Sequence, residues 1–93
     1  MKTRVVNLRK EKYDVYIGRP SLFGNSYTIG RDGTREEVIE KYRRYFCDRI
    51  SEDIHFRNKV EKLRGKILGC YCKPLPCHGD IIVSYLEGEK SAR

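Results

Sequence analysis

Residues 66–80 read KILGCYCKPLPCHGD, a stretch that combines a change of secondary structure with three of the chain's four cysteines. The apolar Ile67 and Leu68 predict a strand over Lys66–Cys72. The two prolines of the PLP triplet end that strand and keep the next residues extended, because proline lacks a backbone N–H and restricts the residue before it. The pair Gly79-Asp80 then opens a final helix, with Ile81, Ile82, Tyr85 and Leu86 on its buried side.

Two further strands are predicted near the start of the chain. Thr3–Leu8 has Val5 and Val6 at its centre, and Tyr13–Ile17 alternates in character. The charged segment 10–12 is expected to be the turn that joins them.

Two helices are predicted between these strands and the stretch at 66–80. Thr34 followed by Glu37 forms a capping box, so the first helix should begin there. Its buried stripe recurs at helical spacing and consists of Val38, Tyr42, Tyr45, Phe46 and Ile50, with Cys47 expected beside it in the core. Ser51 is expected to cap a second helix that Gly65 ends, with Phe56, Val60 and Leu63 on its inner face.

The resulting order is strand, strand, helix, helix, strand, helix (β-β-α-α-β-α). It predicts an α/β (α+β) domain in which a small sheet of about three strands is covered by three helices. The 93 residues are expected to form a single domain, 1–93, with a polar tail from about residue 88.

The cysteines Cys70, Cys72 and Cys77, together with His78, predict a metal site. Residues two apart on a strand point to the same side, so the first two thiols should face one point, and the proline-bounded loop can bring the other two groups back to it. Three thiols and one imidazole form the ligand set of a zinc site, and three cysteines could also hold an iron–sulfur cluster. The adjacent pair Cys77-His78 leaves open whether His78 is a ligand or a catalytic group.

A second interpretation of the same residues needs no metal. Cys77 lies just before a helix N-terminus, where the helix dipole and a neighbouring imidazole favour a reactive thiolate. Cys77, His78 and Asp80 are therefore candidate catalytic residues. A third interpretation is three packed cysteines without chemistry.

The long loop after the second predicted strand carries candidate anion-binding residues. Its segment 18–26 contains Arg19, Ser21 and Asn25 between glycines, and could wrap a phosphate or a base, although it lacks the Walker A pattern. Asn7 and Arg9 are expected to face the same cleft. The alternative is a structural loop in which Leu22 and Phe23 fill the core.

The composition of the chain indicates its cellular compartment and the class of its binding partner. The charged N-terminus does not resemble a signal peptide, no run approaches the roughly 20 apolar residues of a membrane span, and the clustered cysteines favour a reducing compartment. We therefore expect a cytoplasmic protein. The net charge of +7 favours nucleic acid, a nucleotide or a phosphorylated substrate as partner, the alternative being a basic surface that only aids solubility.

The motifs together resemble the family called domain of unknown function 4326. The matching residues are Val5–Arg9, Tyr16–Pro20, Phe23–Asn25, Leu68–Pro74 and Cys77–Asp80, which cover nearly the whole chain. The family is widespread in phages, other viruses and microbes, so the resemblance implies a phage or viral protein, in the host cytoplasm if viral. Two positions depart from the family pattern: Ser26 stands where members commonly have proline, and Tyr71 where they often have tryptophan.

These observations give one leading functional hypothesis and two alternatives. The leading hypothesis is a small metal-binding protein, with zinc or an iron–sulfur cluster, that binds or acts on a nucleotide or nucleic acid. The first alternative is a cysteine-dependent or open-cluster enzyme acting on a phosphorylated or nucleotide substrate. The second is a structural or interaction module whose metal stabilises a small core. Whether the protein is an enzyme stays open at this point.

Overall fold

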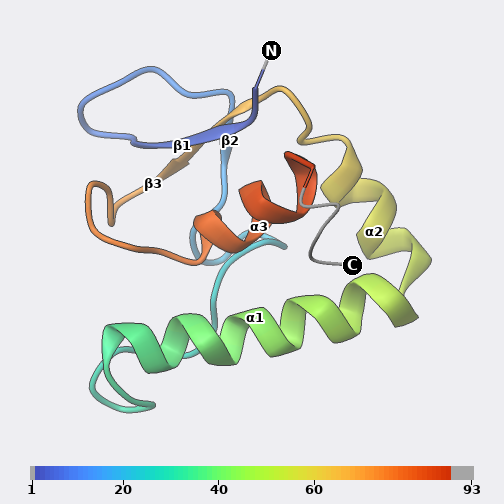
Figure 1. The fold of residues 1–93 in the computed structure, drawn as a ribbon. Coiled ribbons are helices and arrows are strands. Elements are labelled where there is room, and N and C mark those ends of the chain that lie inside the picture. Colours follow the sequence, from blue (N-terminus) through green and yellow to red (C-terminus); the bar gives the residue numbers. More distant parts are fainter. Residues whose placement is uncertain (1, 89–93) are drawn as a thin grey trace.

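The computed structural model describes residues 2–88, so the polar tail predicted from about residue 88 lies almost entirely outside the described residues. The elements follow the predicted order (Figure 1). They are β1 (Arg4–Asn7), β2 (Val15–Tyr16), α1 (Arg35–Glu52), α2 (Ile54–Glu61), β3 (Ile67–Cys70) and α3 (Gly79–Leu86).

The three strands form one parallel sheet in the order β1-β3-β2. Val5 pairs with Leu68 from one side and Val15 pairs with Leu68 from the other, so β3 is the central strand. The predicted turn at 10–12 does follow β1, because the N–H groups of Lys10 and Glu11 both donate to the carbonyl of Asn7. It does not join two paired strands, however: β1 and β2 lie on opposite edges of β3.

Helix α3 lies between the sheet and α1 and holds the two layers together (Figure 1). Its first residue, Gly79, approaches the sheet so closely that a Cβ atom there would lie 2.7 Å from Ile17 Cδ1 and 2.8 Å from Val5 Cγ2. A side chain at this position would force these neighbours or α3 to shift, so the glycine allows the start of α3 to lie close against the sheet.

The capping box of α1 is confirmed, and the predicted cap of α2 is wrong. Thr34 accepts a hydrogen bond from the Glu37 N–H, and the Glu37 side chain accepts one from the Thr34 N–H. Helix α1 continues through Ser51, whose hydroxyl donates back to the Cys47 carbonyl. The residue that caps α2 is Asp53, which accepts from the Phe56 N–H.

The core is built from one face of each helix and from the strands. Val38, Tyr42 and Phe46 of α1 are buried, whereas Tyr45 and Ile50 are partly buried. Cys47 is exposed, so its predicted place in the core is wrong. One residue advances an α-helix by about 100°, which turns Cys47 away from the buried face that its neighbour Phe46 occupies. No helix within residues 2–88 combines the length and the apolar character needed to cross a membrane.

Candidate functional site

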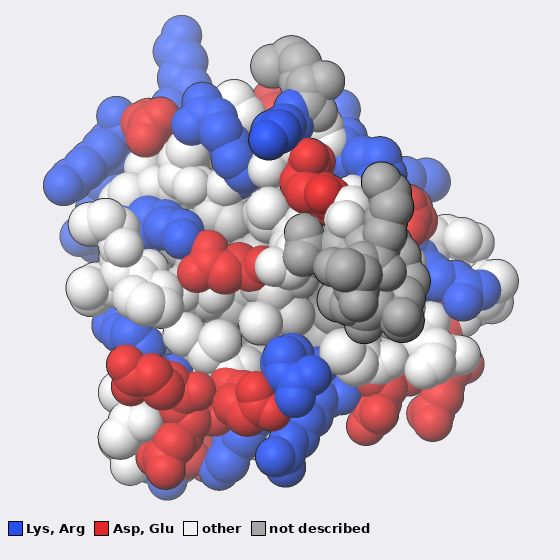
Figure 2. All heavy atoms as spheres, in the orientation of Figure 1, with Lys and Arg blue, Asp and Glu red and all other residues white. Residues whose placement is uncertain are grey.

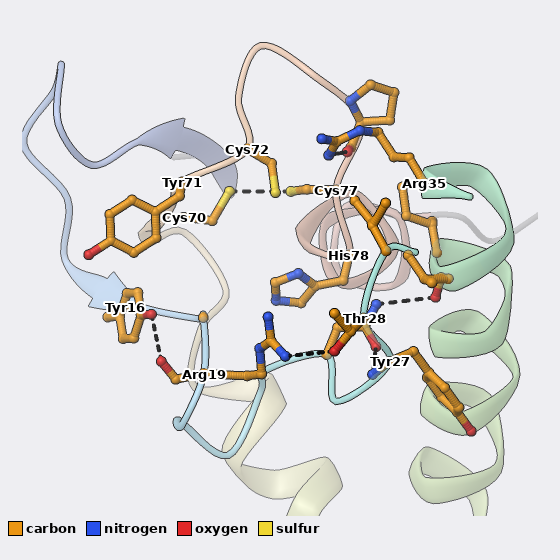
Figure 3. A pocket seen from close by; sticks show the side chains of 16 residues that line it. Tyr16, Arg19, Tyr27, Thr28, Arg35, Cys70, Tyr71, Cys72, Cys77 and His78 are labelled. Carbon is orange, nitrogen blue, oxygen red and sulfur yellow. Dashed lines mark hydrogen bonds between the residues drawn. The ribbon is translucent and has the colours of Figure 1, made fainter. Parts of the chain in front are cut away.

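A cleft of about 530 Å³ opens beside the carboxyl end of β3, and we call it the thiol cleft (Figure 3). It lies between the segment from β2 to residue 29, the start of α1 and the loop from β3 to α3. Its lining residues are Tyr16, Gly18, Arg19, Asn25, Tyr27, Thr28, Ile29, Arg35, Val38, Ile39, Cys70, Tyr71, Cys72, Pro76, Cys77 and His78. The cleft therefore joins the cysteine/histidine cluster to part of the predicted anion-binding loop.

Two thiols meet in this cleft. Cys70 is the last residue of β3 and Cys77 precedes α3, and their sulfur atoms are 3.4 Å apart. Both residues are 2% exposed, yet both line the cleft. Cys72 is half-buried and lines the same cleft. All four cysteines are free thiols.

The loop that carries the cysteines is fastened from outside the cleft. The Asn7 amide donates to the carbonyl of Lys73 at 2.8 Å, which ties the loop to the end of β1. Asp80 accepts from the Cys77 N–H at 3.1 Å and pairs with Lys73 at 2.5 Å. Neither Asn7 nor Asp80 lines the cleft, so both position the thiols.

The two thiols differ strongly in their electrostatics. The hydrogen bond from Cys77, followed by N–H groups of Cys72 and Lys73 and by the lysine charge, lowers the pKa of the Cys70 thiol to about 6. The same hydrogen bond to Cys70, together with burial, raises the pKa of the Cys77 thiol well above its ordinary value. The contact between the two sulfurs therefore favours a negative charge on Cys70 over one on Cys77.

His78 is buried, with its ring edge-on to Tyr42 at a centroid distance of 5.0 Å. Nε2 lies 2.7 Å from the carbonyl oxygen of Ile17. Burial is the main cause that lowers the pKa of His78, although the bond to Ile17 opposes it. The ring is neutral at pH 7, so Nε2–H donates to that carbonyl and Nδ1 carries the lone pair.

The charged side chains of the cleft are two arginines without a carboxylate among the lining residues. Arg19 donates to the Thr28 hydroxyl at 3.1 Å and Arg35 donates to the Pro76 carbonyl at 3.1 Å. Within residues 2–88 neither forms an ion pair, whereas six other arginines do: Arg4, Arg31, Arg43, Arg44, Arg49 and Arg64. The two arginines therefore give the lining of the thiol cleft a positive charge.

The rest of the surface looks different. On the face drawn in Figure 2, acidic and basic residues lie next to one another over α1, and basic residues predominate over the loop between β1 and β2. In that loop region Arg9 lies over the ring of Tyr71, 5.0 Å from its centroid. Arg9 thus stands outside the cleft but contacts a side chain that lines it.

The predicted anion-binding loop is partly structural. The Asn25 amide lines the cleft, but it donates to the Val38 carbonyl and accepts from the Tyr27 N–H, so it holds the loop against α1. Ser21 accepts from the Phe23 N–H and does not line the cleft. Phe23 packs against the core, as the structural interpretation of the loop predicts, but Leu22 is exposed, so that part of the interpretation is wrong.

Of the predicted site residues, the cleft brings together six: Arg19, Asn25, Cys70, Cys72, Cys77 and His78. It does not include Asn7, Arg9, Ser21 or Asp80. Sequence reasoning missed Arg35 and the tyrosines at 16, 27 and 71. Arg35 was detectable, because a basic residue in the first turn of a helix opposes the helix dipole and so requires another reason to be there.

The four predicted metal ligands are not gathered into one group. Within residues 2–88 no three or more histidine, cysteine, aspartate or glutamate side chains are arranged to hold a metal ion. His78 directs Nε2 to the Ile17 carbonyl, so only Nδ1 could serve as a ligand. Zinc and an iron–sulfur cluster therefore stay predictions.

Comparison with known proteins settles the family. The family model described as Domain of unknown function (DUF4326) matches residues 2–88. The chain belongs to this family. It is 48% identical over 80 residues to an uncharacterized 12.4 kDa protein in the nrdA-td intergenic region of Enterobacteria phage T4, covering 85% of this chain and 72% of the phage protein.

A second relative comes from a giant virus. The chain is 32% identical over 88 residues to the uncharacterized protein R718 of Acanthamoeba polyphaga mimivirus, covering 75% of this chain and 64% of that protein. No solved structure matches significantly. The predicted family is thus confirmed, and the relatives are phage and viral proteins.

Proposed function

We propose that the protein binds a nucleotide-type ligand, a phosphorylated molecule that carries a base, in the thiol cleft. The observation that carries the proposal is the pair Arg19 and Arg35, which line one cleft from two elements with no carboxylate among the lining residues. Most arginines elsewhere in residues 2–88 are neutralised by a neighbouring acid. Arginines with free donor capacity in a concave site are suited to phosphate oxygens.

The shape and the other side chains support a base as well as a phosphate. Tyr16 and Tyr71 lie on one side of the cleft and Tyr27 on the other (Figure 3). Tyrosine rings provide flat surfaces on which a base can stack, a contact that tolerates any base. A volume of about 530 Å³ is in the range of sites for small ligands.

The test measures binding of a nucleoside triphosphate and of a short oligonucleotide by titration calorimetry at low salt. Arg19→Ala and Arg35→Ala should each weaken binding by about tenfold or more, because each removes charged hydrogen bonds to phosphate. Arg43→Ala is the matched control, since Arg43 pairs with Glu40 on α1 outside the cleft. Equal losses in all three variants, or no affinity in the wild type, would contradict the proposal.

The second candidate is the metal site at Cys70, Cys72 and Cys77. The specific observation is that Cys70 and Cys77 already place their sulfurs 3.4 Å apart. Two thiolates bound to one zinc at about 2.3 Å each are separated by about 3.8 Å in a tetrahedral site, so these two sulfurs are already close to the separation that one ion requires.

Elemental analysis and a visible spectrum of protein purified without oxygen test this candidate. A zinc site gives a colourless protein with about one zinc per chain, and an iron–sulfur cluster gives a brown one. Cys72→Ala should lose the metal and Cys47→Ala, which changes an exposed thiol, should keep it. Equal metal content in both variants removes the candidate.

A further inference from the structure

The closest contact between two reactive side chains in the thiol cleft is the one between Cys70 and Cys77. Their sulfurs are 3.4 Å apart, and a disulfide bond needs about 2.05 Å. The six residues 71–76 that separate them form a loop, which can take up a movement of about 1.4 Å more easily than a strand or a helix can. The two free thiols are therefore placed to bond with each other.

Their surroundings favour this pair over the other thiols. Cys47 lies exposed on α1 and does not line the cleft. Cys72 is half-buried and is not hydrogen-bonded to another sulfur in residues 2–88. Only Cys70 and Cys77 are both buried and in mutual contact within the described residues.

We propose that Cys70 and Cys77 form a reversible dithiol–disulfide centre that gives two electrons to a small hydroperoxide. The substrate class follows from access: both residues are 2% exposed and both line the cleft, so a molecule of a few atoms can reach their sulfurs more easily than a protein disulfide can. The centre goes beyond ligand binding and does not depend on it.

The sulfur that reacts first is that of Cys70. Cys70 ends β3, its sulfur lies against that of Cys77, and the loop that follows it carries the cationic Lys73. The Cys70 thiolate attacks the nearer oxygen of the hydroperoxide, an S–O bond forms and the O–O bond breaks. The leaving alkoxide or hydroxide takes up a proton, and Cys70 becomes a sulfenic acid.

The second step closes the pair. The Cys77 sulfur attacks the Cys70 sulfur, the S–S bond forms and the S–O bond breaks. The hydroxide that leaves takes the Cys77 proton and departs as water. Two sulfurs have then lost two electrons together and the peroxide has gained them. An external thiol returns the pair to the reduced state by thiol–disulfide exchange.

The test treats the reduced, full-length protein with hydrogen peroxide and follows thiol number and mass. The wild type should lose two of its four thiols and about 2 Da, and fragmentation should place the bond between Cys70 and Cys77. Dithiothreitol should restore both thiols. Cys47→Ser, which changes the exposed thiol outside the cleft, is the control that should still form the bond.

Single variants separate the two steps. Cys77→Ser should stop at the sulfenic acid, so that dimedone labels Cys70, and Cys70→Ser should form no disulfide at all. Locating the disulfide bond in the wild-type protein tests the proposal even if one of the variants does not fold. A bond that involves Cys72, a bond only between two chains through Cys47, or no loss of thiols would overturn the proposal. None of these results depends on whether a nucleotide binds.

Discussion

Single residues of the site divide into those that face the cleft and those that hold others in place. Asn7 shows the second kind: its amide donates to the Lys73 carbonyl and its side-chain oxygen accepts from the Arg9 N–H. From the sequence, Asn7 is a polar residue close to a strand end. Such a residue is as consistent with contacting a ligand as with holding a loop in place. Only the fold, which brings the carbonyls of Tyr71 and Lys73 to the end of β1, assigns its amide to the backbone.

His78 gives a prediction about pH. Burial lowers its folded pKa below the ordinary value of 6.5, so the unfolded chain binds the proton more strongly and stability is lost as pH falls below that value. His78→Gln keeps an amide that can donate to Ile17 but cannot become charged. Its free energy of unfolding in urea should therefore depend less on pH between about 7.5 and 5.5 than that of the wild type.

The control for this prediction is His55→Gln, which makes the same change at an exposed histidine of α2. The lowered pKa of Cys70 acts with the same sign, since stability also falls as its thiolate is protonated. The comparison is therefore between variant and wild type. If the free energy of unfolding depends on pH in the same way in the His78 variant and in the wild type, burial of His78 does not contribute to the pH dependence, and the prediction is wrong.

At the scale of an element, local signals were sufficient for the start of α1 and insufficient for its end. The Thr34 capping box involves residues three apart, and it forms as predicted. Ser51 is as good a capping residue as Asp53 by sequence, but α1 extends past it to Glu52. Phe56 and Val60 are buried in the core, and their placement fixes where α2 must begin. The choice between the two caps is thus made by tertiary packing.

Removal of the true cap should be more costly than removal of the predicted one. Asp53→Ala should lower the free energy of unfolding by about 1 kcal/mol, because the N–H of Phe56 loses its acceptor. Ser51→Ala should change it by less than about 0.5 kcal/mol, as is usual for exposed positions. Urea denaturation of both variants measures the difference, and a larger loss for Ser51→Ala would reverse the assignment.

The contact between α3 and the sheet gives a second prediction at this scale. Gly79→Ala would normally favour a helix, but here the new methyl group meets Ile17 and Val5 at less than 3 Å. We expect a loss of about 1–3 kcal/mol from overpacking. Ser84→Ala, at an exposed site in the same helix, is the control and should be close to neutral. A stabilised Gly79→Ala protein would mean that α3 can move away from the sheet without cost.

At the scale of the whole molecule, the element order was predictable and the strand neighbours were not. Hydrophobic spacing, the capping box and the prolines are local features, and all six elements appear in the predicted order. The pairing of Arg4 with Ile67 joins residues far apart in the sequence, which no local pattern specifies. For the same reason the cleft was predicted only in part: Arg35 reaches it because the start of α1 contacts the loop at Pro76, and Tyr27 because its segment is held against α1 through Asn25.

The net charge of +7 gives a prediction about salt. If an oligonucleotide binds through phosphate contacts, the logarithm of its affinity should fall linearly with the logarithm of salt concentration. Arg19→Ala or Arg35→Ala should each make that slope shallower by about 0.7, the value for one contact to a single strand. Arg43→Ala should leave the slope unchanged, because its charge is already opposed by Glu40. Fluorescence anisotropy at several salt concentrations measures these slopes. Equal slopes in all variants would mean that Arg19 and Arg35 do not contact the phosphates.

The central place of β3 in the sheet also bears on how the chain is made. β1 and β2 both pair with β3 and not with each other, so neither has a partner while residues 67–70 are still inside the ribosome. During translation the first sixty or so residues can form α1, most of α2 and the turns and loop contacts before them, but no strand pairs. The sheet, and with it the cleft that its edge supports, then forms in one late event, after the last strand has emerged.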